Sequence, residues 1–180
     1  MPRVLLPLAQ GCEEIEAVTV IDILRRAQIE VIVAGLDDAP VRASRGVMLI
    51  PDLSLEQAMQ HEYSMIVLPG GQPGSNHLRD DARVIALIKN MAAQGKYIAA
   101  ICAAPAVLAY AGLLDGKRAT SYPGALDAFT EVQQQTQAVV EDGKMITSRG
   151  PGTAMEFALL LVERLCGAAR RGEVEAGLQR

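Results

Sequence analysis

Cys102 stands where a buried strand is expected to end and a helix to begin. Residues 97–101 before it are apolar, and Ala103, Ala104 and Pro105 follow it. Small residues let the backbone turn tightly, as glycines do around the nucleophile of hydrolases, and proline suits a first helical turn. The pattern predicts a nucleophile elbow, with the Cys102 thiol at the carboxyl end of a sheet.

The expected helix start beside Cys102 bears on the acidity of its thiol. A helix N-terminus carries roughly half a positive charge, which favours thiolate and can bring a cysteine pKa from about 8.5 toward the range of about 3.5 to 7.5. The sequence therefore predicts a lowered pKa for Cys102. The alternative is an inert buried cysteine, as most free cysteines are, and the elbow context favours the reactive interpretation.

A second pattern ends in a glycine pair. Residues 65–68 form an apolar strand, followed by Pro69, Gly70 and Gly71. Open α/β sheets bind ligands at the carboxyl ends of their strands. There, the N–H groups of Gly71 and Ala103 are candidates to hold an oxyanion derived from a carbonyl substrate, or the oxygens of an oxidised cysteine. A plain turn is the alternative for this glycine pair.

Three glutamates, Glu13, Glu14 and Glu16, lie near the expected start of the first helix. Acidic residues at a helix start usually compensate the helix dipole and remain solvated. A titratable group in a cleft is the functional alternative. The residues alone leave both interpretations open for Glu16.

A sheet covered by helices on both faces must position these residues. Helical patterns at 13–28 and 82–94 alternate with apolar runs at 4–8, 31–36, 47–50, 65–68 and 97–101. Continuous apolar strands are typical of a parallel sheet, and only 3% of residues are aromatic, so aliphatic side chains must fill the core. The predicted fold class is α/β, a doubly wound, mostly parallel sheet. In the first helix, Ile15 and Val18 are expected to face the core.

The last third of the chain predicts a different arrangement. An Asp-Gly pair within residues 139–146 predicts a hairpin with a type I′ turn, which adds antiparallel strands at an edge. Pro151 starts a pattern for a long helix through residue 165. Residues 168–180 are polar and contain two glycines, which break the helical propensity.

Composition excludes several classes of protein. The 180 residues suffice for one domain, 1–180, and the net charge of −4 lacks the basic footprint of a nucleic-acid-binding protein. The apolar run at 4–8 is too short for a signal peptide or membrane span, so we predict a cytoplasmic protein with no membrane partner. Three widely spaced cysteines predict no disulfide, and two histidines without a Cys-x-x-Cys pair predict no metal site.

Several motifs in a fixed order resemble the ThiJ/PfpI superfamily, and within it the branch of bacterial YajL and the human Parkinson-disease protein. The resemblance runs nearly end to end, and its motifs occupy residues 11–16, 25–27, 43–47, 67–71, 99–105 and 147–153. It implies a flavodoxin-like fold, a homodimer, Cys102 as an oxidisable nucleophile and Glu16 as its protonated hydrogen-bonding partner.

The resemblance also implies the surroundings of this pair. The pocket would use the backbone N–H groups of Gly71 and Ala103. Arg45 would lie near the dimer interface, and Gly150 and Pro151 would lie on the pocket rim. For Arg26, the same interface and a solvated surface position are equal alternatives.

Two departures from the family pattern limit what carries over. The peptidase-like branch has histidine directly after the cysteine, where this chain has Ala103, so a Cys-His protease lacks its base. A human relative has histidine facing the cysteine from a later loop, where this chain has Tyr122, which donates a hydrogen bond but is a poor base near neutral pH. The C-terminus is also shorter and more polar than in that relative.

Two classes of function follow. In the first, which we favour, the protein is a cofactor-free enzyme that processes small reactive aldehydes or glycated proteins, as a glutathione-independent glyoxalase or a protein deglycase, with Cys102 attacking and Glu16 moving protons. In the second, Cys102 is a redox sensor, oxidised to sulfinate in a stress-response chaperone.

Overall fold

A seven-stranded sheet forms the centre of the computed structural model, which describes residues 1–179. Its strands follow the order β10-β11-β7-β6-β1-β2-β5. Their bounds are Arg3–Leu8 (β1), Glu30–Gly35 (β2), Leu53–Ser54 (β5), Met65–Leu68 (β6), Tyr97–Ile101 (β7), Val139–Asp142 (β10) and Met145–Ser148 (β11). β10 pairs antiparallel with β11, and the other neighbouring strands pair in parallel. The mostly parallel sheet predicted from the sequence is confirmed.

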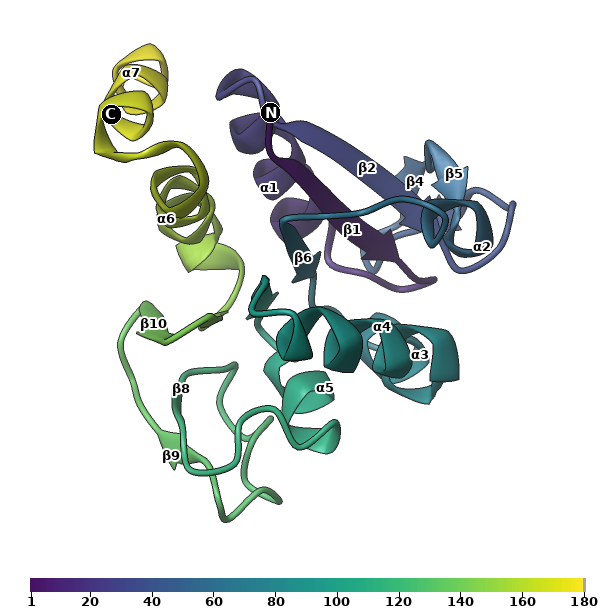
Figure 1. Cartoon of the computed structure of the whole chain (residues 1–180). Helices are drawn as coiled ribbons and strands as arrows, with labels where there is room; N and C mark the ends of the chain where they lie inside the picture. Colours follow the sequence, from purple (N-terminus) through teal and green to yellow (C-terminus); the bar gives the residue numbers. More distant parts are fainter. Residues whose placement is uncertain (180) are drawn as a thin grey trace.

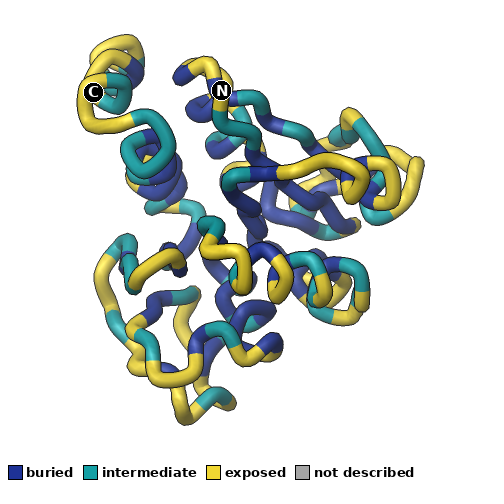
Figure 2. The backbone as a smooth tube through the Cα atoms, viewed as in Figure 1, coloured by how far each residue is buried: buried dark blue, intermediate teal, exposed yellow. Residues whose placement is uncertain are grey.

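Helices cover both faces of this sheet (Figure 1). One face carries α1 (Glu14–Arg26) and α6 (Ala154–Cys166), and the other carries α3 (Gly74–Asp80), α4 (Ala82–Ala93) and α5 (Pro105–Tyr110). The short α2 (Leu55–Ala58) follows β5 at the edge. The buried residues concentrate along the central strands (Figure 2).

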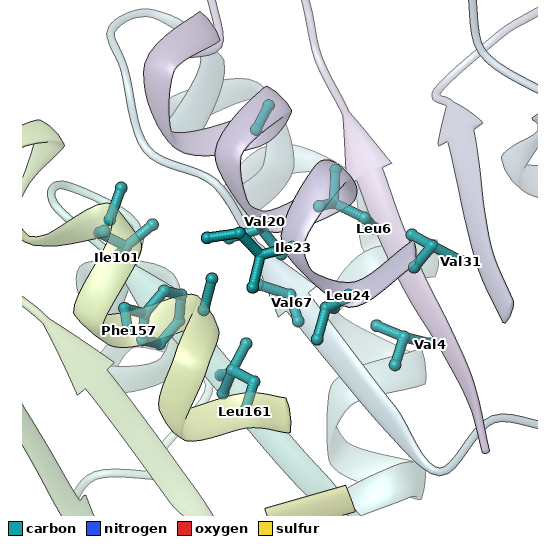
Figure 3. Close-up of a cluster of buried hydrophobic side chains, with 14 of the residues drawn as sticks. Val4, Leu6, Val20, Ile23, Leu24, Val31, Val67, Ile101, Phe157 and Leu161 are labelled. Carbon is teal, nitrogen blue, oxygen red and sulfur yellow. The ribbon is translucent and has the colours of Figure 1, made fainter. Parts of the chain in front are cut away.

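Alternate side chains of β1 enter the two separate cores. Val4 and Leu6 pack in the cluster that holds Ile23 of α1 and Phe157 of α6 (Figure 3), whereas Leu5 packs on the opposite face. Successive side chains of a strand point to opposite faces, so a strand covered on both sides must be apolar at every position. This explains why the central strands are continuous apolar runs in the sequence.

The buried side of α1 differs from the one expected. Ile15 and Val18 are 54% and 45% exposed, so their assignment to the core was wrong. The buried face carries Ala17, Val20 and Leu24, which also follow helical spacing. Because apolar residues continue around this helix, periodicity alone did not select the face that meets the sheet.

The sequence pattern placed residues 47–50 in the main sheet, and this prediction was wrong. β4 (Met48–Leu49) pairs only with β3 (Val41–Arg42), in a separate antiparallel sheet. Ile50 is 82% exposed, so this apolar run is not a buried strand. Another small sheet joins β8 (Arg118–Ala119) and β9 (Gln133–Gln134).

The predicted hairpin forms, with a different turn. Asp142 pairs with Met145, so Gly143 and Lys144 are the loop residues. Gly143 has a φ of 64°, and Lys144 is not among the described residues with positive φ. A type I′ turn requires positive φ at both positions, so that part of the prediction was wrong. β10 lies at the edge of the sheet as expected, while β11 pairs in parallel with β7.

The long helix predicted after Pro151 is present as α6, preceded by a 3-10 turn, η1 (Pro151–Thr153). The polar tail forms a helix too, α7 (Ala168–Gly177), so the predicted break was wrong. Val174 is buried, and Arg171 forms a 2.6 Å ion pair with Glu163 of α6. These contacts offset the unfavourable helix propensity of the two glycines. Across residues 1–179, every helix is too short or too polar to span a membrane.

Candidate active site

Cys102 occupies a sharp turn directly after β7. Its φ of 66° lies in the left-handed region, which is costly for a residue other than glycine and is typical of functional sites. Two backbone hydrogen bonds fix the turn: the Cys102 N–H donates to the Ser148 carbonyl at 2.9 Å, and the Tyr122 N–H donates to the Cys102 carbonyl at 2.8 Å. Pro105 begins α5 three residues later. The backbone therefore has the elbow shape expected from the sequence.

Glu16 lies in the first turn of α1 and is fully buried. Its Oε2 accepts a 2.7 Å hydrogen bond from the Gly70 N–H. Its other oxygen, Oε1, has no hydrogen-bond partner of good geometry among residues 1–179. Burial raises the pKa of Glu16 to about 7, although hydrogen bonds from Gly70 and from the Cys102 thiol oppose this rise. The carboxyl is thus able to gain and lose a proton near neutral pH.

Glycine at residue 70 lets the thiol and the carboxyl meet. A Cβ placed there would lie 2.6 Å from Cys102 Cβ and 2.7 Å from Glu16 Oε2. Gly71 is constrained differently: its φ is 91°, and a Cβ there would lie 2.4 Å from the Glu13 backbone nitrogen. Both positions of the pair therefore require the absence of a side chain.

Burial raises the pKa of the Cys102 thiol to about 12, and the charge of Glu16 and its hydrogen bond add to this effect. The backbone N–H groups of Gly71 and Ala103 interact with the sulfur and oppose the rise. The lowered pKa predicted from the helix start was therefore wrong. The helix α5 has only six residues. The stabilisation of a thiolate by its dipole is therefore outweighed by burial and by the nearby Glu16 carboxyl. Ionisation of Cys102 is consequently coupled to the proton on Glu16.

Three further candidates from the sequence come together beside the elbow. Tyr122, Gly150 and Pro151 line one cavity of about 340 Å³, together with Pro123, Arg149, Gly152 and Thr153. Tyr122 is 54% exposed, and its ring lies over Gly150, with Cδ2 3.5 Å from the position that a Cβ of Gly150 would take. Tyr122 is held next to the elbow by its backbone hydrogen bond to Cys102, although the lining of this cavity does not include Cys102 or Glu16.

Arg26 and Arg45 are not brought to the thiol within this chain. The Arg26 Nε lies 2.7 Å from Asp22 Oδ2, in an exposed ion pair on α1. The exposed Arg45 donates its backbone N–H to Glu14 Oε1 at 2.9 Å. The interface roles of both arginines remain predictions.

Glu13 and Glu14 are buried, so the expectation that they are solvated was wrong. The Ser44 hydroxyl lies 2.8 Å from Glu13 Oε2 and 3.1 Å from Glu14 Oε2. Burial acts to raise the pKa of Glu14, but hydrogen bonds from its own backbone, from Ser44 and from the Arg45 N–H outweigh burial and lower this pKa. These two carboxylates hold the loop at residues 43–47 against the start of α1.

Residue types alone did not identify three contributors to the site. Gly70 supplies the N–H that Glu16 accepts, Ser148 supplies the carbonyl for Cys102, and Arg149 lines the cavity. All three fall inside motifs at residues 67–71 and 147–153. Gly70 and Ser148 act through backbone groups, which leave no trace in a residue type, so the position of these motifs was the available signal. Among residues 1–179, no three His, Cys, Asp or Glu side chains gather as metal ligands.

Comparison with known proteins places this chain in one family. A model of the DJ-1/PfpI family matches residues 2–164. Protein dj-1beta of Drosophila melanogaster is 46% identical over 97% of this chain and 95% of its own length. Protein DJ-1 homolog B of Arabidopsis thaliana is 43% identical over 99% of this chain, which spans only 40% of that longer protein. The glutathione-independent glyoxalase DJR-1.2 of Caenorhabditis elegans is 37% identical over 91% of this chain and 88% of its own.

Solved structures show the same fold. The oxidized DJ-1 of Toxoplasma gondii superposes with a TM-score of 0.96 at 44% identity, covering 99% of this chain and 98% of that one. Drosophila melanogaster DJ-1beta gives the same TM-score and identity, covering 99% of this chain and 97% of its own. The fold is therefore α/β and flavodoxin-like, as the resemblance implied. By its sequence and by its structure, the chain belongs to the DJ-1/PfpI family.

Proposed function

We propose that this protein converts small 2-oxoaldehydes, such as methylglyoxal, into 2-hydroxy acids without glutathione. The observation that carries this proposal is the fully buried Glu16, whose pKa is raised to about 7 and whose carboxyl interacts with the Cys102 thiol. A general acid or base acts best when its pKa lies near the working pH. A relative named as a glutathione-independent glyoxalase supports the same class of reaction.

The first step joins Cys102 to the aldehyde. The Glu16 carboxylate accepts the thiol proton while the sulfur forms a bond to the aldehyde carbon, and the electron pair of the C=O bond moves to its oxygen. The N–H groups of Gly71 and Ala103, which already face the sulfur, are placed to stabilise this oxyanion. Protonated Glu16 then gives its proton to the oxygen, which leaves a hemithioacetal and regenerates the carboxylate.

The second step moves hydrogen between neighbouring carbons. Glu16 removes the proton from the carbon bonded to sulfur, which gives an enediolate, and returns that proton to the adjacent carbon. The hydroxyl proton passes between the two substrate oxygens, and a 2-hydroxy thioester forms. Water cleaves this thioester, so methylglyoxal plus water yields lactate and the free Cys102 thiol without an external oxidant or reductant.

Lactate formation from methylglyoxal in glutathione-free buffer tests this mechanism. We expect turnover by the parent protein, and a loss of about a hundred- to ten-thousand-fold in Glu16→Gln, because a positioned acid or base contributes that much. Cys102→Ser should lose at least as much. Glu62→Gln removes the same charge from an exposed position and serves as the matched control. Parent-level turnover in Glu16→Gln would remove the proton-transfer role.

The same groups are suited to an early glycation adduct on a protein, which presents a similar carbon to Cys102. Tyr122, which is 54% exposed, borders the open depression next to the elbow, and a larger substrate would place its protein-borne side chain there. Recovery of the unmodified peptide from a methylglyoxal-treated peptide, measured by mass spectrometry after free methylglyoxal is removed, tests this deglycase activity.

A redox role is the second candidate. The Gly71 and Ala103 N–H groups that face the sulfur are equally placed to bind the oxygens of a cysteine sulfinate. A similar structure is described as the oxidized form of Toxoplasma gondii DJ-1. A pure sensor would form no lactate above buffer, while mild peroxide would add two oxygens to Cys102 ahead of Cys12 and Cys166. Three free cysteines fit the reducing cytoplasm, where we place the protein.

We also propose that the protein acts as a homodimer. A set of large apolar side chains is exposed on α1 and on or directly beside β4: Ile15, Val18, Val47, Met48 and Ile50. Exposed apolar patches commonly mark protein interfaces, and the loop of Arg45 lies within this segment. Light scattering at micromolar concentration should give twice the chain mass for the parent and a monomer mass for Ile50→Glu.

A further inference from the structure

Arg149 is the charged residue between two cavities that are otherwise lined by uncharged side chains. It lines the cavity of about 340 Å³ beside Tyr122. It also lines a second cavity of about 170 Å³, whose other lining residues, Thr136 among them, are uncharged. Among residues 1–179, Arg149 is therefore the one charged residue in the lining of either space.

The guanidinium of Arg149 is only partly used by the protein. Its Nη1 donates to the Thr136 carbonyl at 3.1 Å, and a guanidinium has five N–H donors. No carboxylate of residues 1–179 lies within ion-pair distance of it, which distinguishes Arg149 from Arg164 and Arg171, whose guanidinium groups pair with Glu141 and Glu163. The side chain is half-buried. An unpaired, half-buried guanidinium is suited to bind a carboxylate in bidentate geometry.

The backbone places this charge beside the reactive elbow. Arg149 follows Ser148, whose carbonyl accepts the hydrogen bond from the Cys102 N–H. Tyr122, across the cavity, donates its N–H to the Cys102 carbonyl. The larger of the two spaces is an open depression on the surface, with Tyr122 and Arg149 both in its lining. Tyr122 and Arg149 therefore lie on the two backbone segments that are hydrogen-bonded to the elbow.

We propose that Arg149 is a specificity-determining residue that selects 2-oxoaldehydes carrying a terminal carboxylate. This inference rests on the proposed glyoxalase function. A suitable substrate is 4,5-dioxopentanoate: its aldehyde carbon bonds to Cys102, its carboxylate pairs with Arg149, and addition of one water gives 2-hydroxyglutarate. The neutral aldehyde 2-oxopentanal has the same chain length and lacks the charge.

The first test compares kcat/KM for these two aldehydes. We expect the parent to prefer 4,5-dioxopentanoate, and the ratio of the two kcat/KM values to fall about 10- to 100-fold in Arg149→Gln, because a hydrogen bond to a charged group contributes that much. Arg149→Lys should retain part of the preference. Arg170→Gln loses the same charge on α7, far from the loop of Tyr122 (Figure 1), and should keep the parent's ratio.

The second test does not depend on catalysis. Iodoacetate and iodoacetamide both alkylate Cys102 with release of iodide, and they differ in one negative charge. We expect the ratio of the iodoacetate rate to the iodoacetamide rate, measured by mass spectrometry of the Cys102 peptide, to fall about three- to tenfold in Arg149→Gln. The iodoacetamide rate itself reports that the elbow is intact in the variant.

The outcomes separate the two proposals. Turnover of both aldehydes, with the same ratio in the parent and in Arg149→Gln, overturns the role of Arg149 and leaves the glyoxalase function standing. Absence of turnover with either aldehyde overturns the glyoxalase function, and the alkylation ratio then decides alone whether Arg149 attracts anions to Cys102. An unchanged alkylation ratio would refute that attraction.

Discussion

Cys102 and Cys12 are both buried, at 8% and 1% exposure, and burial raises the pKa of each thiol to about 12. Their neighbours differ. Cys102 faces the N–H groups of Gly71 and Ala103 and a carboxyl that titrates near neutral pH, whereas the strongest charge acting on Cys12 is Glu14, whose pKa is lowered. Burial and thiol pKa therefore do not distinguish the two cysteines. The distinction is the hydrogen bond between the Cys102 thiol and the Glu16 carboxyl, together with backbone donors that can stabilise new negative charge.

The largest contrast is expected in turnover. Cys102→Ala should reduce lactate formation by more than about a thousandfold, since nucleophile and base act as one unit. Cys12→Ala should stay within about threefold of the parent, because Gly71, Ala103 and the Glu16 carboxyl form hydrogen bonds with the sulfur of Cys102 and not with that of Cys12. Steady-state kinetics on both variants, with circular dichroism to confirm folding, provide the measurement. Equal losses in both would mean that the two thiols act together.

The pH dependence of alkylation should separate the same two residues. Because the pKa of Glu16 is about 7, its carboxylate fraction rises about tenfold per pH unit below that value and levels off above it. The rate of Cys102 alkylation by iodoacetamide should follow this curve, since the carboxylate accepts the thiol proton. Cys12 should show no plateau near neutrality. Peptide mass mapping from pH 5 to 9 measures both rates, and a Cys102 profile without an inflection near pH 7 would contradict the coupling.

The smallest effect concerns stability. Because the folded pKa of Glu16 is about 7 and its ordinary value is 4.5, the folded state holds a proton between these values that the unfolded state has released. The contribution of Glu16 to the free energy of unfolding is thus fully present below pH 4.5 and falls by roughly 3 kcal/mol as pH rises to 7. Glu16→Gln should lack this fall. Urea unfolding of both proteins at several pH values measures the difference, and parallel curves would disprove the raised pKa.

The elbow could be predicted from sequence because its determinants are local. An apolar strand, one cysteine and a run of small residues before proline specify the turn at Cys102 without reference to the rest of the chain. Glu16 could not be assigned from its own surroundings, because its partner Gly70 lies 54 positions away. The predicted direction of the Cys102 pKa shift was wrong for the same reason, since burial and the Glu16 carboxyl act on the thiol through tertiary structure.

The errors in the fold have the same origin. Strand runs buried on both faces were recognised, but the orientation of α1 was not, because Ile15 and Val18 are exposed and follow helical spacing as regularly as the buried residues. The helix α7 was missed because its docking depends on Val174 and on the ion pair between Arg171 and Glu163. Such contacts are absent from any scale of local propensity.

The left-handed backbone of Cys102, with φ at 66°, has a consequence for the evolution of this chain. Glycine adopts that conformation freely, while any other residue there costs of order 1 kcal/mol or more. Selection for stability alone would therefore drift this position toward glycine. A lineage that keeps a side chain here accepts a permanently less stable fold, and that loss is tolerable only while the sulfur is useful. In a copy of this chain freed from its function, residue 102 should be among the first of the site positions to change.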